Sequence, residues 1–342
     1  MHCYQLHSPC IPAAYQPALT LEFARNQELE YRDLLPGTGL TAADLAAQSL
    51  TPAGYLRLLH NLATALPDGD TAFLLGQTLL PGHQGPISHA LLQARNLGQA
   101  LELLLRYQAW LSPLLAPHLM RQGEQTLLYW TDSCISARQR IFLVEMMMAA
   151  VSGMARWLSG QRLPWQYSFN RTRPAHPEQY AVHLGSQVQF NAYLDAMAID
   201  SHWLEQPWPR GSEMGVQMAL AAAEREFGWQ ARRSLLAGLY DYLHQHIRQS
   251  PSLEQCSAAL GTSPATLKRH LAAHDTHFQA ELDQVRTHVT LELIHNRGYS
   301  NEQIAAHLGF HDANNFRRSF KRWTGLTPSV FRSHLFQLQA SE

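Results

Sequence analysis

Two stretches of sequence decide the fold: Ser252-Leu-Glu-Gln-Cys-Ser-Ala-Ala-Leu-Gly261 and Ser300-Asn-Glu-Gln-Ile-Ala-Ala-His-Leu-Gly309. They align at an offset of 48 residues, and after the glycine the match continues at an offset of 49. Each begins with a serine followed three residues later by a glutamine, which is the pattern of a capping box at a helix N-terminus. Each ends in Leu-Gly, and glycine tolerates the left-handed backbone of a tight helix end. The sequence therefore predicts a repeated unit that opens with a short helix and a tight turn.

A second helix follows the turn in each unit, over 264–274 and 313–322. Ser263-Pro264 provides an N-cap and a first-turn proline, and Asp312 is the expected cap of the later helix. Apolar residues spaced four apart mark the inner faces: Leu267, Leu271, Phe316 and Phe320. A helix, a tight glycine turn and a helix with one basic face is the plan of a helix-turn-helix. One copy alone would be typical of an ordinary helical hairpin, but two copies favour tandem helix-turn-helix units over 252–274 and 300–322.

The segment between the units predicts one long helix. Its apolar residues step by four, three, four and four: Phe278, Leu282, Val285, Val289 and Leu293. A connecting helix of about 18 residues is roughly 27 Å long, and successive major grooves lie about 34 Å apart on one face of DNA. We therefore expect the two second helices to enter two successive major grooves.

With the inner faces assigned, the outward side chains are the candidates for DNA contact: Ala265, Lys268, Arg269, Asn314, Asn315, Arg317 and Arg318. Arginine donates to guanine and asparagine pairs with adenine in the major groove. About half to two-thirds of protein–DNA hydrogen bonds go to the backbone, so phosphate contact by Arg317 and Arg318 stays open. For Lys321, Arg322 and Arg332 we expect phosphate contact or a solvated surface position.

The C-terminal part, about 235–334, resembles the DNA-binding domain of AraC/XylS-type transcription regulators. The resemblance rests on Ile304–Phe310, Asn315–Trp323 and Thr324–Arg332, and more loosely on Ser263–Leu271. It implies that the outward residues of the second helices bind operator or promoter DNA. The departures are Thr287 and Thr290, where the family usually has leucine and alanine, and His311-Asp312, where Ser-Asp or Ser-Gln is commoner.

Residues 1–209 mix helical and strand-like patterns and predict an α+β domain, joined to an all-α C-terminal domain. Helices are indicated from Tyr55 to Leu66 and over 100–111 and 141–158. Strands are indicated over 126–130, 165–170 and 188–191, and more weakly over 180–184.

This upstream part resembles the arabinose-binding-like effector and dimerisation domain found in one branch of the same family. This resemblance rests on four short motifs: Gly69-Asp70, Leu75-Gly76, Gly98-Gln-Ala100 and Leu204–Pro209. The resemblance implies a small-molecule effector, a homodimer, and RNA polymerase as a partner if the protein activates. No effector residue is assigned: Met146–Met148 and four aromatic residues would either line a pocket or pack in the core, the methionines more often the latter. The aromatic residues are Trp130, Trp157, Trp165 and Tyr167.

Proline and glycine between Pro207 and Gly215 indicate a boundary. We expect a linker over 210–230 and the DNA-binding domain over 231–342. A stripe beside this boundary would either contribute to a dimer contact or pack on its own domain: Met214, Met218, Ala221 and Ala222.

The charge of the whole chain argues at first against nucleic acid, since 26 basic and 27 acidic residues give a net charge of −1. The sum conceals an uneven distribution. Residues 230–342 carry 12 basic and 9 acidic side chains, and the two lysines of the chain, Lys268 and Lys321, both fall on predicted recognition helices. We expect moderate, salt-sensitive DNA affinity.

Other chemistries find little support. The cysteines at 3, 10, 134 and 256 are unclustered, and no catalytic motif or nucleotide-binding loop occurs, so we expect no enzyme, no cofactor and no metal. His270, His274 and His277 have a spacing that metal sites use, but a polar helix face is the simpler interpretation.

Two alternatives remain: a DNA-repair enzyme with a cysteine methyl acceptor fused to the DNA-binding domain, and a ligand-independent DNA-binding protein.

No signal peptide is visible, and Glu145 and Arg156 interrupt the apolar run 141–158, which predicts a soluble cytoplasmic protein without a membrane span.

Overall fold

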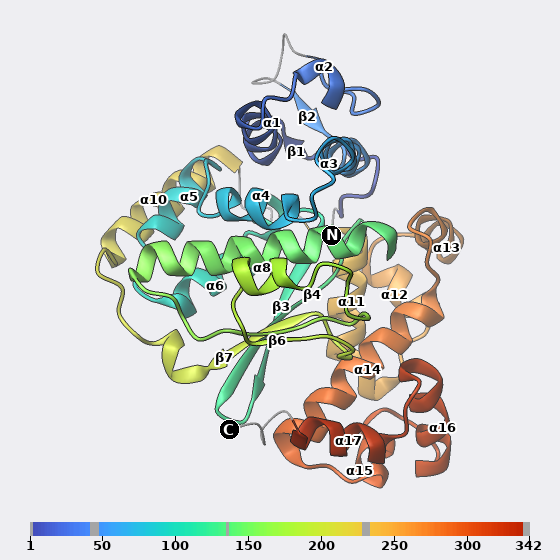
Figure 1. The fold of residues 1–342 in the computed structure, drawn as a ribbon. Coiled ribbons are helices and arrows are strands. Elements are labelled where there is room, and N and C mark those ends of the chain that lie inside the picture. The colour runs from blue at the N-terminus through green and yellow to red at the C-terminus, as the bar shows by residue number, and fades with distance from the viewer. Residues whose placement is uncertain (1–2, 42–47, 135–136, 228–232, 338–342) are drawn as a thin grey trace. The chain divides into compact units, whose positions relative to one another are not determined.

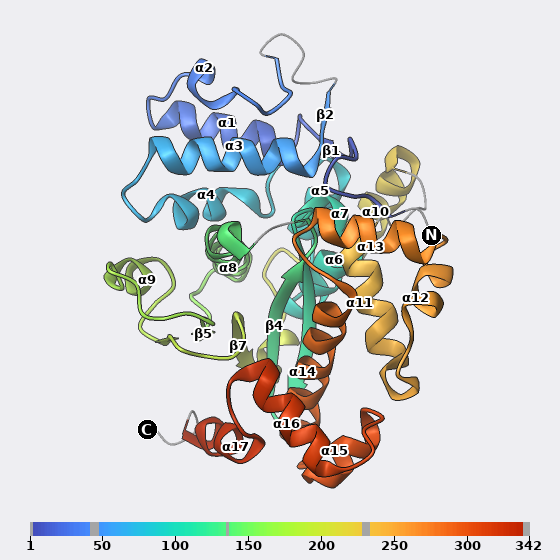
Figure 2. The ribbon, with the colours of Figure 1, turned by 90° about the vertical axis from the view of Figure 1, so that its right-hand side faces the viewer.

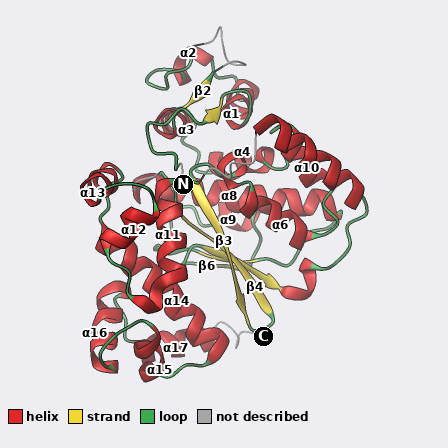
Figure 3. Ribbon diagram, turned by 180° about the vertical axis from the view of Figure 1, so that it is seen from behind, coloured by secondary structure: helices red, strands yellow, loops and turns green. Residues whose placement is uncertain are grey.

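The computed structural model describes residues 3–41, 48–134, 137–227 and 233–337. The chain forms two compact units, one made of residues 3–119 and 124–234 and the other chiefly of the residues from Leu235 onward. The first unit combines helices with sheets, and the described residues from Leu235 onward form helices and no strand (Figure 3). The predicted α+β and all-α classes are both confirmed.

The N-terminal unit contains a five-stranded sheet in the order β3-β4-β7-β5-β6. Strand β7 runs antiparallel to both β4 and β5, and β6 runs parallel to β5. The strands are β3 (Leu115–Gln122), β4 (Gln125–Asp132), β5 (Gln166–Ser168), β6 (Val188–Gln189) and β7 (Ala196–Asp200), with a separate pair β1 (Ile11–Pro12) and β2 (Ser49–Leu50).

Ten α-helices and one short 3-10 helix accompany these sheets among the described residues of the unit. They are α1 (Gln16–Asn26), α2 (Tyr31–Leu34), α3 (Pro52–Ala65), α4 (Thr71–Leu79), α5 (Pro86–Leu92), α6 (Leu97–Arg106), α7 (Gln108–Leu111), α8 (Ala137–Ser159), α9 (Glu178–His183), η1 (Ser201–Leu204) and α10 (Glu213–Phe227).

The predicted strands over 126–130, 165–170 and 188–191 are confirmed as β4, β5 and β6. The weaker strand over 180–184 is wrong, because this segment lies in helix α9. The physical reason lies in the packing of Tyr180, whose buried ring packs edge-on against Phe169 and Phe73. A single helical turn can supply this one inward side chain, so the segment does not need the alternating inward side chains of a strand. Strands β3 and β7 were not predicted, since Pro117 interrupts the first and the second lacks apolar–polar alternation.

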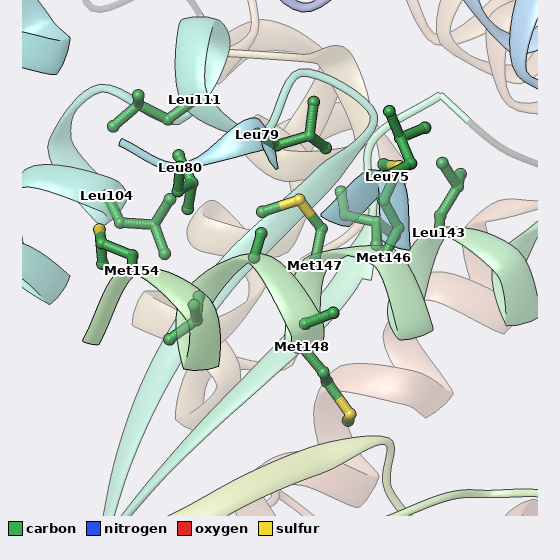
Figure 4. Packing of buried hydrophobic residues seen from close by; sticks show 14 of the residues in the cluster. Leu75, Leu79, Leu80, Leu104, Leu111, Leu143, Met146, Met147, Met148 and Met154 are labelled. Atoms are coloured by element: carbon green, nitrogen blue, oxygen red, sulfur yellow. The ribbon is translucent and has the colours of Figure 1, made fainter. Parts of the chain in front are cut away.

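The core of this unit is built on the packing of α4 against α8 (Figure 1). A Cβ atom on Gly76 would lie 2.2 Å from the carbonyl oxygen of Met146, so only glycine permits this approach. Met146 and Met147 point from α8 toward Leu75 and Leu79 of α4, whereas Met148 points to the opposite side (Figure 4). All three methionines are buried, as the core interpretation of this run predicts.

Helix α8 also resolves the question of a membrane span. By length and composition alone, Gln139–Ser159 is apolar enough to cross a membrane, in spite of Glu145 and Arg156. In the structure, 67% of the most apolar 18-residue stretch of that segment is buried within the protein. Its apolar character is therefore that of a core helix.

The short motifs of the upstream resemblance hold neighbouring elements together. A Cβ atom on Gly98 would lie 3.0 Å from the carbonyl oxygen of Leu204, so α6 and η1 approach closely there. The backbone N–H of Trp208 donates to the carbonyl of Arg95 at 2.7 Å. The residues of these motifs therefore hold neighbouring elements of the N-terminal unit in close contact.

The range 210–230, expected as a linker, contains helix α10. Val216, Ala219 and Ala223 form its buried face, and the helix packs against α5 within the N-terminal unit. The compact unit extends in this way to Ser234. Residues 228–232, where we expect the linker to end and the DNA-binding domain to begin, lie outside the described residues.

The C-terminal unit contains the two predicted helical hairpins and the helix between them. Its elements are α11 (Leu235–His246), η2 (Ile247–Gln249), α12 (Leu253–Ala259), α13 (Pro264–Ala273), α14 (Phe278–Arg297), α15 (Asn301–His307), α16 (Ala313–Thr324) and α17 (Pro328–Gln337). Both capping boxes form, at Ser252 with Gln255 and at Ser300 with Gln303. Gly261 and Gly309 adopt φ angles of 69° and 74°, as tight helix ends require.

Helix α14 connects the hairpins, and Figure 2 shows α12–α13 and α15–α16 toward its opposite ends. It packs against α11 and α16. Thr287 and Thr290, the departures from the family pattern, donate their hydroxyls to the carbonyls of Asp283 and Arg286 one turn earlier. Thr290 is fully buried, so this internal bond is what allows a hydroxyl in the interior.

The second hairpin encloses an aromatic cluster. Phe316 has no exposed surface, and its ring centroid lies 5.7 Å from Phe320 and 6.0 Å from Phe310. Phe320 in turn packs edge-on against Phe331 of α17. The cluster joins α16, α17 and the turn that follows α15.

The N-terminal unit buries an ionisable group, the carboxyl of Glu145, in its core. Glu145 of α8 accepts hydrogen bonds from Arg171 and Tyr180 and is 7% exposed. Burial raises the pKa of Glu145 to about 7, and the nearby Arg171 guanidinium offsets this only in part. At neutral pH the carboxyl is therefore close to its titration midpoint.

Replacing Phe316 by alanine should destabilise the C-terminal unit by about 3–5 kcal/mol, because it leaves a cavity in the aromatic cluster. Differential scanning calorimetry of the full chain measures the effect. Arg317→Ala, at the exposed neighbouring position, should leave the melting profile unchanged. Identical profiles for wild type and Phe316→Ala would contradict the assigned packing.

The free energy of unfolding should decrease as pH rises from about 4.5 to about 7, because folded Glu145 retains a proton that the unfolded chain has released. Glu145→Gln should remove this contribution and flatten the slope relative to wild type. Urea unfolding at a series of pH values measures it, with Glu178→Gln on the surface of α9 as control. A slope that persists in Glu145→Gln assigns the titration to another group.

Candidate DNA interface and effector pocket

Helix α13 presents its predicted outward face to solvent. The Ser263 hydroxyl accepts a hydrogen bond from the Thr266 backbone N–H at 3.1 Å, which starts the helix after the turn. Leu267 and Leu271 have no exposed surface. The three outward candidates of this helix are exposed: Ala265, Lys268 and Arg269.

Helix α16 is capped by Asp312, whose Oδ1 accepts from the Asn315 backbone N–H at 2.7 Å. Full burial of Phe316 and Phe320 fixes its rotation. Asn315 is half-buried, and five candidate residues are exposed: Asn314, Arg317, Arg318, Lys321 and Arg322. The structure thus brings all the α16 candidates onto one helix surface, and their contact with DNA stays a prediction.

Side-chain hydrogen bonds organise the first turns of α16. The Asn315 Nδ2 donates to Asp312 at 3.1 Å, and Arg318 Nη2 donates to Asn315 Oδ1 at 2.7 Å. Both ends of the Asn315 amide are therefore occupied, and the chain of bonds orients the Arg318 guanidinium. Adenine recognition by Asn315 would need these bonds to open, whereas Arg318 retains further N–H donors.

Two other arginines of α16 lie close to carboxylates. Arg317 Nη2 is 3.7 Å from Glu302 Oε1 of α15, and Arg322 Nη2 is 3.5 Å from Asp283 Oδ2 of α14. Sequence reasoning missed the second pair, because 39 residues separate its members and no periodicity links them. DNA phosphates would compete with these carboxylates for the two guanidinium groups.

Arg332 differs from the expectation of phosphate contact or solvated surface. Its Nη2 donates to the backbone carbonyl of Tyr299, and the side chain is half-buried. Burial lowers the pKa of Arg332. The residue therefore ties α17 to the start of α15.

The three histidines in and after α13 lie at different depths. His274 is 7% exposed, whereas His270 is half-buried and His277 is exposed. Burial, together with the nearby Arg269, lowers the pKa of His270 and favours a neutral ring at pH 7. Within the parts of the chain that the structure describes, no three His, Cys, Asp or Glu side chains gather as a metal site would require.

The N-terminal unit contains an open pocket of about 1250 Å³. Trp157, Trp165 and Tyr167 line it, but Trp165 and Tyr167 are also buried members of the core, so for these two residues both interpretations hold. Trp130 has no exposed surface and belongs to the core. Most of the lining comes from α4, α8, α9 and the segments 80–89 and 160–167.

A methyl-acceptor enzyme would need a reactive thiolate and a four-cysteine zinc site. Cys134 and Cys256 are buried, and burial raises the pKa of both thiols, to about 11 for Cys256. A raised pKa suppresses the nucleophilic thiolate. The geometry gives no support to this alternative.

Comparison with known families identifies both units. Residues 29–208 match the arabinose-binding N-terminal domain of AraC transcription regulators, and residues 256–334 match a helix-turn-helix domain. The chain therefore belongs to the AraC family: it is a DNA-binding transcription regulator with an effector-binding N-terminal domain.

Among its relatives, the ornithine utilization regulator of Pseudomonas aeruginosa is 31% identical over 269 residues, covering 76% of this chain and 77% of that protein. An HTH-type transcriptional regulator of Mycobacterium bovis is 23% identical over 330 residues, covering 93% and 95%. The crystal structure of the transcriptional regulator CdpR from Pseudomonas aeruginosa aligns with a TM-score of 0.44 at 17% identity, covering 93% of this chain and 98% of that one.

Proposed function

We propose that this regulator reads two successive major grooves of its operator, with α13 in one groove and α16 in the next. One observation carries the proposal: two exposed basic helix faces belong to hairpins joined by a single continuous helix. A helix of 20 residues, such as α14, is about 30 Å long, close to the roughly 34 Å between successive grooves on one face of DNA.

The candidate residues then divide into two roles. We assign base contact to Ala265, Lys268, Arg269, Asn314 and Arg318, which lie near the starts and middles of the two recognition helices. Asn315 orients Arg318 through the bond described above. We assign phosphate contact to Arg317, Lys321 and Arg322. Arg317 and Arg322 each lie beside a carboxylate, and a DNA phosphate that replaced this carboxylate would keep the arginine paired with a negative charge.

The same proposal includes a homodimer formed through α10. Met214 and Met218 are 72% and 67% exposed, and Ala221 continues their stripe one turn later. Exposed apolar surface on one helical face favours contact with a second copy of the chain. The regulator would act in the cytoplasm without enzymatic activity, and RNA polymerase would be its partner at promoters that it activates.

Effector binding in the N-terminal unit would shift the equilibrium between arrangements of the DNA-binding units in the dimer. Operator affinity and transcription would then depend on the effector. A ligand-independent protein, the alternative to this proposal, would show the same affinity and transcription with and without metabolites.

Arg318→Ala should weaken binding to a selected operator by about 1–3 kcal/mol and relax the base preference at one position. In vitro selection with the full chain supplies the operator, and titrations at fixed salt measure both affinities. Arg322→Ala is the matched control: it should weaken operator and random DNA by the same factor. Equal losses on both DNAs for Arg318→Ala would assign that arginine to phosphate.

The double variant Met214→Glu/Met218→Glu should shift the protein toward monomer, because it places charge in the proposed contact. Analytical ultracentrifugation over a range of concentrations measures the dissociation. Ile141→Glu tests an exposed apolar residue of α8 and should leave the dimer intact. If Ile141→Glu dissociates the dimer and the α10 variant does not, the contact lies elsewhere.

A further inference from the structure

The pocket of the N-terminal unit has an unbalanced charge. Its lining residues include two arginines, Arg156 and Arg162, and no aspartate or glutamate. No ion pair joins either guanidinium to a carboxylate of the described chain. By contrast, Arg140 and Arg171 of the same unit both contact carboxylates. The pocket therefore offers cationic hydrogen-bond donors whose charge the protein does not neutralise.

Apolar and aromatic side chains form one part of the remaining lining, beside polar residues that include Gln77, His83 and His89. Leu163, Trp165 and Tyr167 form a buried floor, and Trp157 at 57% exposure stands beside Arg156 in sequence. An exposed tryptophan against a pocket gives a flat apolar wall for a ligand. A molecule that fits this surface would have an apolar or aromatic body.

The polar groups on the floor add donors and acceptors without negative charge. Ser152 Oγ and Tyr167 OH lie 2.6 Å apart, and the Ser152 hydroxyl also contacts the carbonyl of Met148. Burial raises the pKa of Tyr167 to about 12, so the phenol stays neutral at pH 7. His183 stacks on Phe73, and burial lowers its pKa in spite of the nearby Asp70 carboxylate, which lies outside the lining, so this ring favours the neutral form. The arginines supply the fixed charge of the lining.

We propose that this pocket binds a small organic anion whose carboxylate or phosphate is held by Arg156 and Arg162 and whose apolar body packs on Trp157, Trp165 and Leu163. Planar guanidinium groups recognise carboxylates and phosphates through paired N–H donors, which favours an anion over a neutral sugar or an ammonium compound. This inference rests on the effector role proposed above and specifies the chemical class of the effector.

Arg156 has a competing structural role, because it lies in the last turn of α8, where a cation stabilises the helix end. Arg25 occupies the equivalent place in the last turn of α1 and lies outside the pocket. Arg25→Gln is therefore the matched control for loss of a cation at a helix end. Thermal unfolding separates this helix effect from loss of binding.

The test is a binding panel on the full chain without DNA, read by calorimetry and by tryptophan fluorescence. The probes are phenylpropionate, indoleacetate, octanoate and phenyl phosphate, each beside its neutral amide or alcohol, together with a neutral pentose and a diamino acid. At least one anion should bind saturably, and its neutral counterpart should bind about tenfold more weakly or worse, as expected for loss of a charge-assisted contact. The comparison of the carboxylate probes with phenyl phosphate shows which of the two anionic groups the pocket prefers.

Arg156→Gln/Arg162→Gln should weaken the best anion by about tenfold or more, while Arg25→Gln leaves its affinity unchanged. Equal binding of anion and neutral counterpart, stronger binding of the pentose or the diamino acid, no binding by any anion, or an unaffected double variant would each overturn the inference. Operator binding without ligand is measured on the same samples. If it is retained while the panel fails, the anion pocket is wrong and the DNA-reading proposal stands.

Discussion

The burial of one apolar pair in each second helix is the constraint on which DNA reading depends. Leu267 with Leu271 and Phe316 with Phe320 are fully buried, and a helix so anchored has no freedom to rotate about its axis. The side chains between the anchors must then face outward. A sequence pattern spaced by four residues thus determines which arginines, lysines and asparagines are exposed to solvent, and hence which surface we propose to contact DNA.

The local signals of the C-terminal unit made most of its structure predictable from sequence. Capping boxes at Ser252 and Ser300, the cap at Asp312 and the glycines after each first helix are short-range features, and each forms as its pattern indicates. The pair between Arg322 and Asp283 was not predictable, because it depends on how α16 packs against α14. Long-range contacts of this kind leave no periodic trace in the sequence.

The N-terminal unit was harder to predict, because its elements are stabilised mainly from a distance. Residues 180–184 have the composition of a strand, yet aromatic packing around Tyr180 selects a helix. Strand β3 contains Pro117 and is still part of the sheet, at its edge, where a missing N–H is tolerated. The pocket was even harder to predict from the sequence, because its lining comes from separate segments between Gln77 and Leu184 that no sequence motif connects.

The distribution of arginine partners separates structural from functional charge in this chain. A guanidinium that is withdrawn from much of the solvent needs a carboxylate to offset desolvation, and the half-buried Arg140 and Arg171 have such partners. Arg156, Arg162 and Arg318 are exposed and lack an ion pair with the described carboxylates, so solvation rather than a protein anion stabilises their charge. An external anion that replaces this water gains two or more charge-assisted hydrogen bonds without breaking an internal pair. A chain of net charge −1 can therefore hold two sites for anions, one for a nucleic acid and one for a small molecule, because each site depends on local pairing and not on the total.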